Sequence, residues 1–251
     1  MQSACEQVPV TRADAWKGCS MHKLLFFDLD GTLAEIGKGI LPENIAELHR
    51  LEQSGYRIAI CSGKPVSYLC GQMRQVGLED PILIGENGAV FQFGIELPPR
   101  VYFRYPCSET SRRQLRRMRE LIDEVCRDDV WYQPNDLALT PFPKKEIVFD
   151  QIQELVDTHI EELSELHVYR HSDSFDIVPD NISKYNSLEL LTQRLSMSAQ
   201  QVIAYGDWTN DIPMLEFADL SVKIGRRLEF ETDYTFDTIG EALKATGREI
   251  K

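Results

Sequence analysis

Leu24-Leu25-Phe26-Phe27-Asp28-Leu29-Asp30-Gly31-Thr32 joins a run of four apolar residues to two closely spaced acids. The apolar run predicts a strand buried on both faces, as in a parallel sheet covered by helices on both sides. Asp28 and Asp30 stand at positions i and i+2, and in extended backbone this spacing places both side chains on the same side. Because open α/β sheets bind ligands at the carboxyl ends of their strands, the segment predicts a functional site.

The rest of the sequence alternates helical and strand patterns in two blocks. In the first block, a helix that opens at Pro42 and stops before Gly55 leads to a strand over 56–61, a helix over 66–76 and a strand over 81–84. In the second block, Ser183 is expected to cap a helix that begins at Lys184. Strands over 202–205 and 220–224 and helices from 212 and over 239–245 follow it. This alternation predicts an α/β fold with a doubly wound, Rossmann-like parallel sheet.

The segment between the two blocks has a different pattern and predicts a separate α+β lobe. Two long helices are expected at about 108–127 and 145–163, with short strands at 130–132, 137–140, 167–169 and 175–178. The predicted organisation is an N-terminal extension (1–20), an α/β core (21–88 and 179–251) and an inserted α+β cap domain (89–178).

The composition limits the function classes. With 251 residues and a formal net charge of −13, the chain lacks the basic face that nucleic acids require, and an anionic membrane surface would repel it. No apolar run reaches the roughly 18 residues of a transmembrane helix, and the first 20 residues lack the apolar stretch of a secretory signal. The six cysteines are scattered and form no CxxC pair, which favours reduced thiols and a cytoplasmic location.

Polar residues follow three of the predicted core strands. Asp28 and Asp30 follow the first, Ser62 and Gly63 the second, and Asp207 the fourth, with Asn210 and Asp211 close behind and Lys184 opening a helix. Bare carboxylates would repel one another at one sheet edge, and a hard divalent cation such as Mg²⁺ removes that repulsion. Together with Lys184, Ser62 and backbone N–H groups, the metal would offset the charge of a bound phosphate. One carboxylate can then attack phosphorus and give an aspartyl-phosphate, while a second transfers protons.

These segments resemble, in the expected order, the four motifs of the haloacid dehalogenase-like (HAD) phosphohydrolase superfamily. The resemblance implies that Asp28 is the nucleophile and Asp30 the general acid/base, which also binds Mg²⁺ through its main-chain carbonyl. It further implies that Ser62 and Lys184 bind phosphate and that Asp207 binds the metal with support from Asp211. The place of the insertion resembles the Cof-type, type IIB subfamily, whose members mostly dephosphorylate sugar phosphates and related small phosphomonoesters.

Further candidates for contacts to phosphate or substrate are Gly63, Lys64, Asn87 and Asn210. Lys64 is equally consistent with a surface lysine. Glu86 and Asn87 are equally consistent with a hinge to the cap and with substrate contacts. Trp208 follows Asp207 where the family usually has a small residue, and Tyr185 follows Lys184 where it commonly has glycine. Both aromatic residues bear on the size of the pocket and so on the substrate class.

Three other groups are interpreted as structural. The basic run from Arg112 to Arg119 is typical of a solvated helix face, and His167 and His171 are placed on a strand and turn, where their spacing is no metal signature. The aromatic residues of the insertion are expected to form its core: Trp131, Tyr132, Phe142 and Phe175.

The sequence therefore predicts a Mg²⁺-dependent phosphomonoester hydrolase that acts on a sugar phosphate or similar small phosphorylated metabolite, as a monomer or homodimer. Two alternatives stay open. One is a phosphomutase that uses the same phospho-aspartate. The other is a non-catalytic regulatory or ligand-binding protein in which Trp208 and Tyr185 fill the pocket. A phospho-receiver domain is excluded, because it would have about half this length and no inserted lobe.

Overall fold

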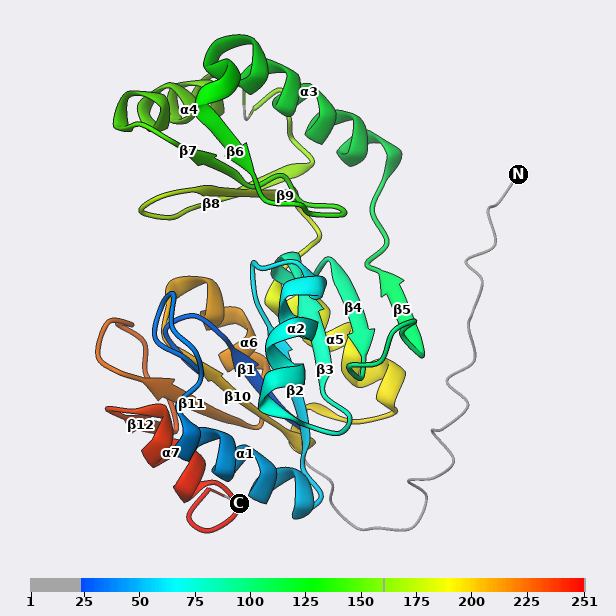
Figure 1. Cartoon of the computed structure of the whole chain (residues 1–251), viewed down its shortest axis with the longest axis vertical. Helices are drawn as coiled ribbons and strands as arrows, with labels where there is room; N and C mark the ends of the chain where they lie inside the picture. Colours follow the sequence, from blue (N-terminus) through cyan, green and yellow to red (C-terminus); the bar gives the residue numbers. More distant parts are fainter. Residues whose placement is uncertain (1–23, 160, 251) are drawn as a thin grey trace.

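Two lobes, an α/β core and a smaller cap, are stacked along the longest axis of the molecule (Figure 1). The structure is a computed structural model that describes residues 24–159 and 161–250. The N-terminal extension predicted for 1–20 lies outside the described residues.

The core is built on one eight-stranded sheet with the order β12-β11-β10-β1-β2-β3-β4-β5. The strands from β12 to β3 are parallel, whereas β4 and β5 run antiparallel to their neighbours. Every residue of β1 is buried, between β2 and β10. The strand bounds are β1 (Leu24–Asp28), β2 (Arg57–Cys61), β3 (Ile82–Gly85), β4 (Val90–Phe93), β5 (Val101–Arg104), β10 (Val202–Gly206), β11 (Leu220–Ile224) and β12 (Tyr234–Phe236).

Helices cover both faces of this sheet, which confirms the predicted α/β fold class. Leu25 and Phe27 of β1 pack in the cluster with α1, α2 and α7, whereas Leu24 and Phe26 pack in the cluster with α5 and α6. The apolar run that opens the described chain is therefore buried on both sides, as predicted. The helix bounds are α1 (Pro42–Gln53), α2 (Val66–Val76), α5 (Lys184–Leu195), α6 (Ile212–Phe217) and α7 (Ile239–Ala245).

The core sheet includes two strands that the sequence pattern assigned to the cap. β4 pairs with β3 and β5 pairs with β4, both antiparallel, so the boundary expected at residue 89 falls inside the core. An antiparallel partner needs no crossover helix. The change of pattern near Ala89 therefore marks a reversal of chain direction, and the chain leaves the core sheet only after Arg104.

The cap contains two helices and two separate antiparallel strand pairs, in agreement with the expected α+β lobe. Its apolar core joins the helices to β8 and β9 around Phe175 and Ile177. The strand expected at 137–140 is reduced to a single bridge from Leu139 to Ile177, and α4 ends at His159, short of the expected residue 163. The bounds are α3 (Glu109–Cys126), β6 (Val130–Tyr132), β7 (Pro141–Pro143), α4 (Glu146–His159), β8 (Leu166–Arg170) and β9 (Phe175–Pro179).

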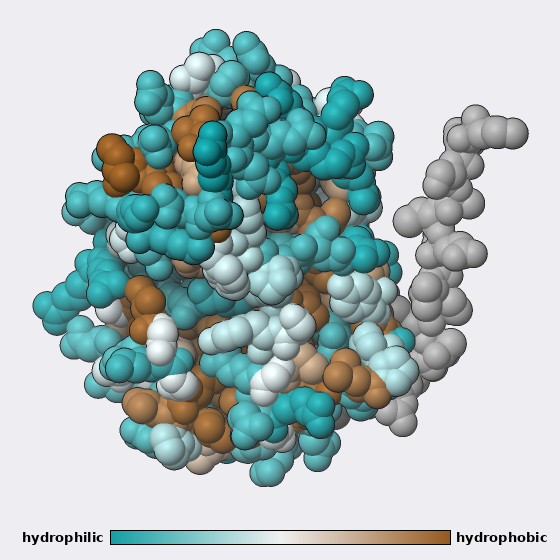
Figure 2. Space-filling view, turned by 45° about the horizontal axis from the view of Figure 1, so that its top comes forward, coloured by the Kyte–Doolittle hydropathy of each residue, from teal (hydrophilic) through white to brown (hydrophobic). Residues whose placement is uncertain are grey.

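The surface agrees with an acidic protein whose apolar residues are mostly buried. Figure 2 shows a face that is largely hydrophilic, with hydrophobic atoms in small separate groups. No helix among residues 24–159 and 161–250 is long and apolar enough to span a membrane. Three of the arginines of α3 form ion pairs with acids of the same helix, among them Arg116–Glu109 at 3.1 Å and Arg119–Asp123 at 3.6 Å. This helix face is therefore balanced in charge, as expected for a solvated surface.

Candidate active site

A cavity of about 400 Å³ lies between the cap and the carboxyl ends of the core strands. The structure brings together at this cavity nearly all the side chains predicted from the sequence, although they come from positions far apart in the chain. Asp211 is the exception and lies just behind the wall. The predicted residues that line the cavity are Asp28, Asp30, Ser62, Gly63, Lys64, Asn87, Lys184, Asp207 and Asn210.

Lys184 joins two of the acids at the floor of this cavity. Its Nζ donates to Oδ1 of Asp28 and to Oδ1 of Asp211, both at 2.6 Å. Ser183 caps the helix that carries Lys184 by accepting the N–H of Asn186, so the lysine starts α5 at a defined position. Within the described chain no protein donor contacts Oδ2 of Asp28, which leaves that oxygen available to a ligand.

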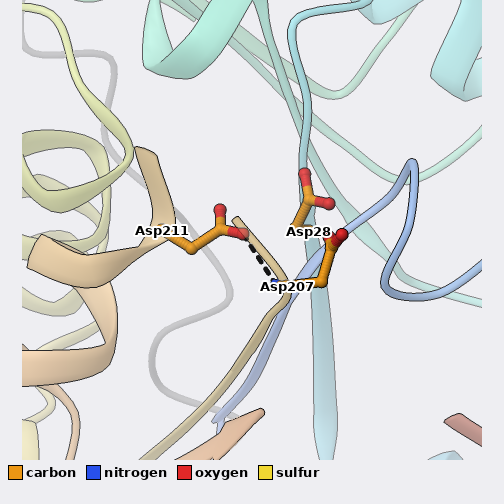
Figure 3. A group of neighbouring side chains, drawn as sticks. All are labelled: Asp28, Asp207 and Asp211. Atoms are coloured by element: carbon orange, nitrogen blue, oxygen red, sulfur yellow. Dashed lines mark hydrogen bonds between the residues drawn. The ribbon is translucent and has the colours of Figure 1, made fainter. Parts of the chain in front are cut away.

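Asp207 and Asp211 are held by the turn that follows β10. Thr32 donates its hydroxyl to Oδ1 of Asp207 at 2.8 Å. Oδ2 of Asp211 accepts the backbone N–H groups of Asp207 and Trp208 at 3.0 and 3.1 Å, the first of which is the dashed line in Figure 3. Both oxygens of Asp211 are thus engaged within the protein, an arrangement suited to positioning Asp207 and Lys184.

The three buried carboxylates form a site that fits a hard cation. One oxygen from each of Asp28, Asp207 and Asp211 lies within 4.8 Å of the others, and Figure 3 shows the side chains converging. Burial raises the pKa of Asp28 to about 7, because Asp211 and Asp207 add to the desolvation and Lys184 only partly opposes it. Although burial opposes its charge, Asp211 and Asp28 hold the pKa of Lys184 above its usual value. One ammonium group therefore faces three acids, and a divalent cation with oxygen ligands would complete the balance.

Gly31 is required by the close approach of Asp207. Its φ is +99°, and a Cβ at this position would lie 2.3 Å from Oδ2 of Asp207. A side chain here would therefore displace a predicted metal ligand. This explains in physical terms why glycine follows Asp30 in the first motif.

The second strand contributes a polar loop. Ser62 is buried, and its Oγ accepts the N–H of Lys64 at 3.2 Å, which leaves the hydroxyl hydrogen free to donate to a ligand. Lys64 lies 3.8 Å from Asp30, a partly exposed ion pair at the cavity wall. Lys64 therefore lines the cavity, and its contact with phosphate stays a prediction.

The cap contributes a buried acid that sequence reasoning missed. Asp176 on β9 accepts hydrogen bonds from Asn87 of the core at 2.7 Å, from Thr140 at 2.7 Å and from His171 at 3.1 Å. Burial disfavours its charge, but His171 and the polar donors more than offset this and hold the pKa of Asp176 below its usual range. The sequence feature that could have indicated Asp176 is its place as an acid between apolar residues in the predicted strand Phe175–Val178.

Glu86 links the core to the cap through three hydrogen bonds. Its carboxylate accepts the N–H groups of Asp136, Leu137 and Ala138 at 2.7–2.8 Å. Glu86 and Asn87 both have a φ of +57°, a region that is unfavourable for residues with side chains. The cap contacts of both side chains accompany this strained turn, which favours the hinge interpretation of Glu86 and Asn87 over direct substrate contact.

The two unusual aromatic residues have different environments. Tyr185 packs edge-on against Phe217 of α6, with ring centroids 5.5 Å apart, and does not line the cavity. Trp208 does line the cavity, with 47% of its surface exposed. The cavity is open with Trp208 on its wall, so the alternative in which both aromatics fill the pocket is wrong.

The other groups interpreted as structural have different surroundings. Phe175 packs against Phe149 in the cap core, as expected, and Phe142 and His171 line the cavity. Trp131 was also expected in the cap core, but 53% of its surface is exposed. His171 binds Asp176, and the only metal-type cluster among residues 24–159 and 161–250 is the aspartate group.

Comparison with known proteins supports the same conclusion as the geometry. A family model described as haloacid dehalogenase-like hydrolase matches residues 25–96 and 111–227. A phosphoglycolate phosphatase of Methanoculleus marisnigri is 24% identical over 208 residues, which cover 81% of this chain and 84% of that protein.

Solved structures share the fold over almost their full length. A haloacid dehalogenase-like hydrolase from Bacteroides thetaiotaomicron superposes with a TM-score of 0.72 at 20% identity, covering 89% of this chain and 98% of that one. A sugar phosphatase of HAD subclass IIB gives a TM-score of 0.63 at 20% identity, with 90% and 99% covered. The fold of this chain, inserted lobe included, is therefore one already known from crystal structures.

Proposed function

Since this chain belongs to the haloacid dehalogenase-like hydrolase family, we propose that it is a Mg²⁺-dependent phosphatase that acts on small phosphomonoesters through a phosphorylated Asp28. The observation that carries this proposal is the contact of Lys184 with Asp28 and Asp211 beside Asp207, at the floor of the cavity. In this arrangement Lys184 fixes Oδ1 of Asp28, and Oδ2 is left available to a ligand.

Asp28 and Asp30 divide the chemistry between them. A free oxygen of Asp28 attacks phosphorus as the bond from phosphorus to the ester oxygen breaks. Asp30 acts as the general acid and gives a proton to the leaving alcohol. Its carboxylate then accepts a proton from water, the water oxygen attacks the phosphoryl group, and inorganic phosphate leaves with Asp28 restored. Lys184 and the Ser62 hydroxyl stabilise the negative charge on the phosphoryl oxygens during both steps.

The acids at the sheet edge would hold the metal. Asp28 and Asp207 would supply carboxylate oxygens and Asp30 a main-chain carbonyl, and bound Mg²⁺ would supply positive charge beside the transferred phosphoryl group. Asp211 positions Asp207 through the backbone and Lys184 through its side chain.

The substrate class is a sugar phosphate or a similar small phosphorylated metabolite. The similarity to proteins named as a phosphoglycolate phosphatase and a sugar phosphatase supports a small organic phosphomonoester. The polar cap residues that reach the core, Gln133 and Asp176, favour a substrate enclosed between the lobes, away from bulk water.

The test is phosphate release from a panel of phosphomonoesters with Mg²⁺ and with EDTA. We expect turnover only with Mg²⁺, and we expect Asp28→Asn to abolish it while the thermal midpoint stays close to that of the wild type or rises. Asp219→Asn, the same change at an exposed position outside the cavity, should leave turnover intact. Retained activity in Asp28→Asn would contradict the mechanism. Conversion of a sugar phosphate to an isomer without phosphate release would instead identify a phosphomutase.

A further inference from the structure

The cavity has an apolar part that phosphate chemistry does not use. Trp208 and Ile36 line it from the core with 47% and 66% of their surfaces exposed, and Phe142 lines it from the cap. Exposed apolar side chains are ordinary when scattered. Here two exposed side chains, Trp208 and Ile36, and the half-buried Phe142, from three separate chain segments, line one cavity, and such a group in a ligand site indicates an apolar part of the ligand.

Trp208 is held in place by the same acid that organises the proposed metal site. Its backbone N–H donates to Oδ2 of Asp211 at 3.1 Å, next to the corresponding bond from Asp207. Trp208 therefore directly follows Asp207, a carboxylate of the proposed centre. The hydrogen bond fixes the backbone of Trp208 beside the proposed centre, and the Trp208 side chain lines the cavity from there.

The size of the cavity leaves room for more than a phosphate group. Its volume of about 400 Å³ lies in the range of small-molecule pockets. A phosphomonoester with a two- or three-carbon chain would leave part of this volume to water, whereas a ring in the leaving group would be large enough to contact Trp208 or Phe142.

We propose that Trp208 determines substrate specificity by stacking on the flat apolar face of a ring in the leaving group. This inference rests on the proposed phosphatase function and narrows its substrate class to ring-bearing phosphomonoesters. Two kinds of ring have such a face, a pyranose sugar and a planar heteroaromatic base, and indole stacks on both.

The first experiment compares kcat/KM for three esters that share a primary phosphate: glycerol 1-phosphate, glucose 6-phosphate and uridine 5′-monophosphate. We expect at least one ring-bearing ester to exceed glycerol 1-phosphate about tenfold, and Trp208→Ala to lower that ratio about tenfold, mainly through KM. Trp208→Phe should restore most of the ratio because it keeps an aromatic face. Tyr68→Ala is the matched control, since Tyr68 is a core aromatic, 51% exposed, outside this cavity; the ratio should not change.

A binding measurement tests the stacking without turnover. In Asp28→Asn, titration of the preferred ring-bearing ester should change the tryptophan emission, and the double variant with Trp208→Phe should lose this change. Trp16 and Trp131 remain in both proteins, so the difference reports Trp208 alone.

The outcomes separate the two proposals. Preference for glucose 6-phosphate or for uridine 5′-monophosphate supports the inference and identifies the kind of ring. Equal ratios in wild type and Trp208→Ala, or no emission change in Asp28→Asn, overturn it while phosphatase activity stands. If no ester, p-nitrophenyl phosphate included, is hydrolysed, the proposed function fails, and the emission titration still decides whether Trp208 contacts a ring.

Discussion

Among residues 24–159 and 161–250, Lys184 is the one buried cation beside the acids at the cavity floor, and only 3% of its surface is exposed. Lys184→Met keeps most of the side-chain volume but leaves Asp28 and Asp211 without their common partner. Removing one partner from a buried ion pair costs about 3–5 kcal/mol, so we expect a loss of this size in the free energy of unfolding, measured with urea. Lys244→Met, an exposed lysine of α7, should change it by less than about 0.5 kcal/mol. If both variants lost the same free energy of unfolding, the contacts of Lys184 with Asp28 and Asp211 would contribute nothing to stability.

The pKa of Asp28 predicts how stability depends on pH. Its pKa is about 7 in the folded protein and 3.8 in the unfolded chain, so the folded state binds the proton more tightly. Without metal, the wild type should therefore lose stability relative to Asp28→Asn as the pH rises through this interval, by roughly 1–3 kcal/mol. Urea unfolding of both proteins in EDTA at a series of pH values measures the difference. A difference independent of pH would contradict the assigned shift.

Alanine variants at Gly31 and Gly37 separate two effects: the collision of a new Cβ with Asp207, and the strain of a positive φ in a residue that carries a Cβ. Both have positive φ, +99° and +72°, but a Cβ at Gly37 would meet nothing within 4 Å. Both alanine variants should lose stability by about 1–2 kcal/mol. Only Gly31→Ala should also lower kcat/KM, by about 100-fold, because Asp207 must move. A similar kcat/KM in the two variants would show that Gly31 is not required for the position of Asp207.

Glu86 connects the strained turn after β3 to the cap segment 136–138. Glu86→Gln replaces an acceptor of three N–H groups by an amide, so at least one buried donor should lose its partner at a cost of about 1–3 kcal/mol. We expect a lower thermal midpoint and faster hydrogen exchange at the amides of 136–138. Glu162→Gln, at an exposed position of the cap, is the control. Unchanged exchange at 136–138 would mean that the link does not hold this segment.

The elements of the core could be predicted wherever apolar runs and helix ends agree. The ranges 66–76, 220–224 and 239–245 coincide with α2, β11 and α7. The strands β4 and β5 were not predicted, and their residues were placed in the cap. β4 is buried throughout and β5 alternates in burial, as strands of either lobe could, so only the pairing of β4 with β3 places them in the core. β12 was missed because a three-residue edge strand is too short to show a period.

The residues that line the cavity from the core could be predicted from the sequence, whereas those that line it from the cap could not. The residues placed at the ends of β1, β2 and β10 line one cavity because the carboxyl ends of parallel strands share one sheet edge. Asp176, Thr140 and Gln133 reach the same cavity through the orientation of the cap, which depends on tertiary contacts such as Gln133 to Gly63. No local sequence pattern encodes such a contact.

The response of the whole protein to metal gives a further prediction. If Mg²⁺ binds the folded state alone, it stabilises it by RT ln(1 + [Mg²⁺]/Kd), about 2.7 kcal/mol at 100 times Kd. The thermal midpoint of the wild type should therefore rise by several degrees with Mg²⁺ and fall back with EDTA. Asp207→Asn should show little of this rise. A rise of equal size in Asp207→Asn would place the metal elsewhere.

The insertion of the cap between β5 and α5 has a consequence for synthesis on the ribosome. β1 forms one of its two ladders with β10, and both β10 and Lys184 follow the cap in the chain. At about 5–20 residues per second, translation from Arg104 to Val202 takes roughly 5–20 s, and one edge of β1, a fully buried strand of the folded protein, stays unpaired during this time. An open strand edge invites pairing with other chains. The nascent protein should therefore need its greatest protection from aggregation while the cap is being translated, and the phosphate site should be completed last.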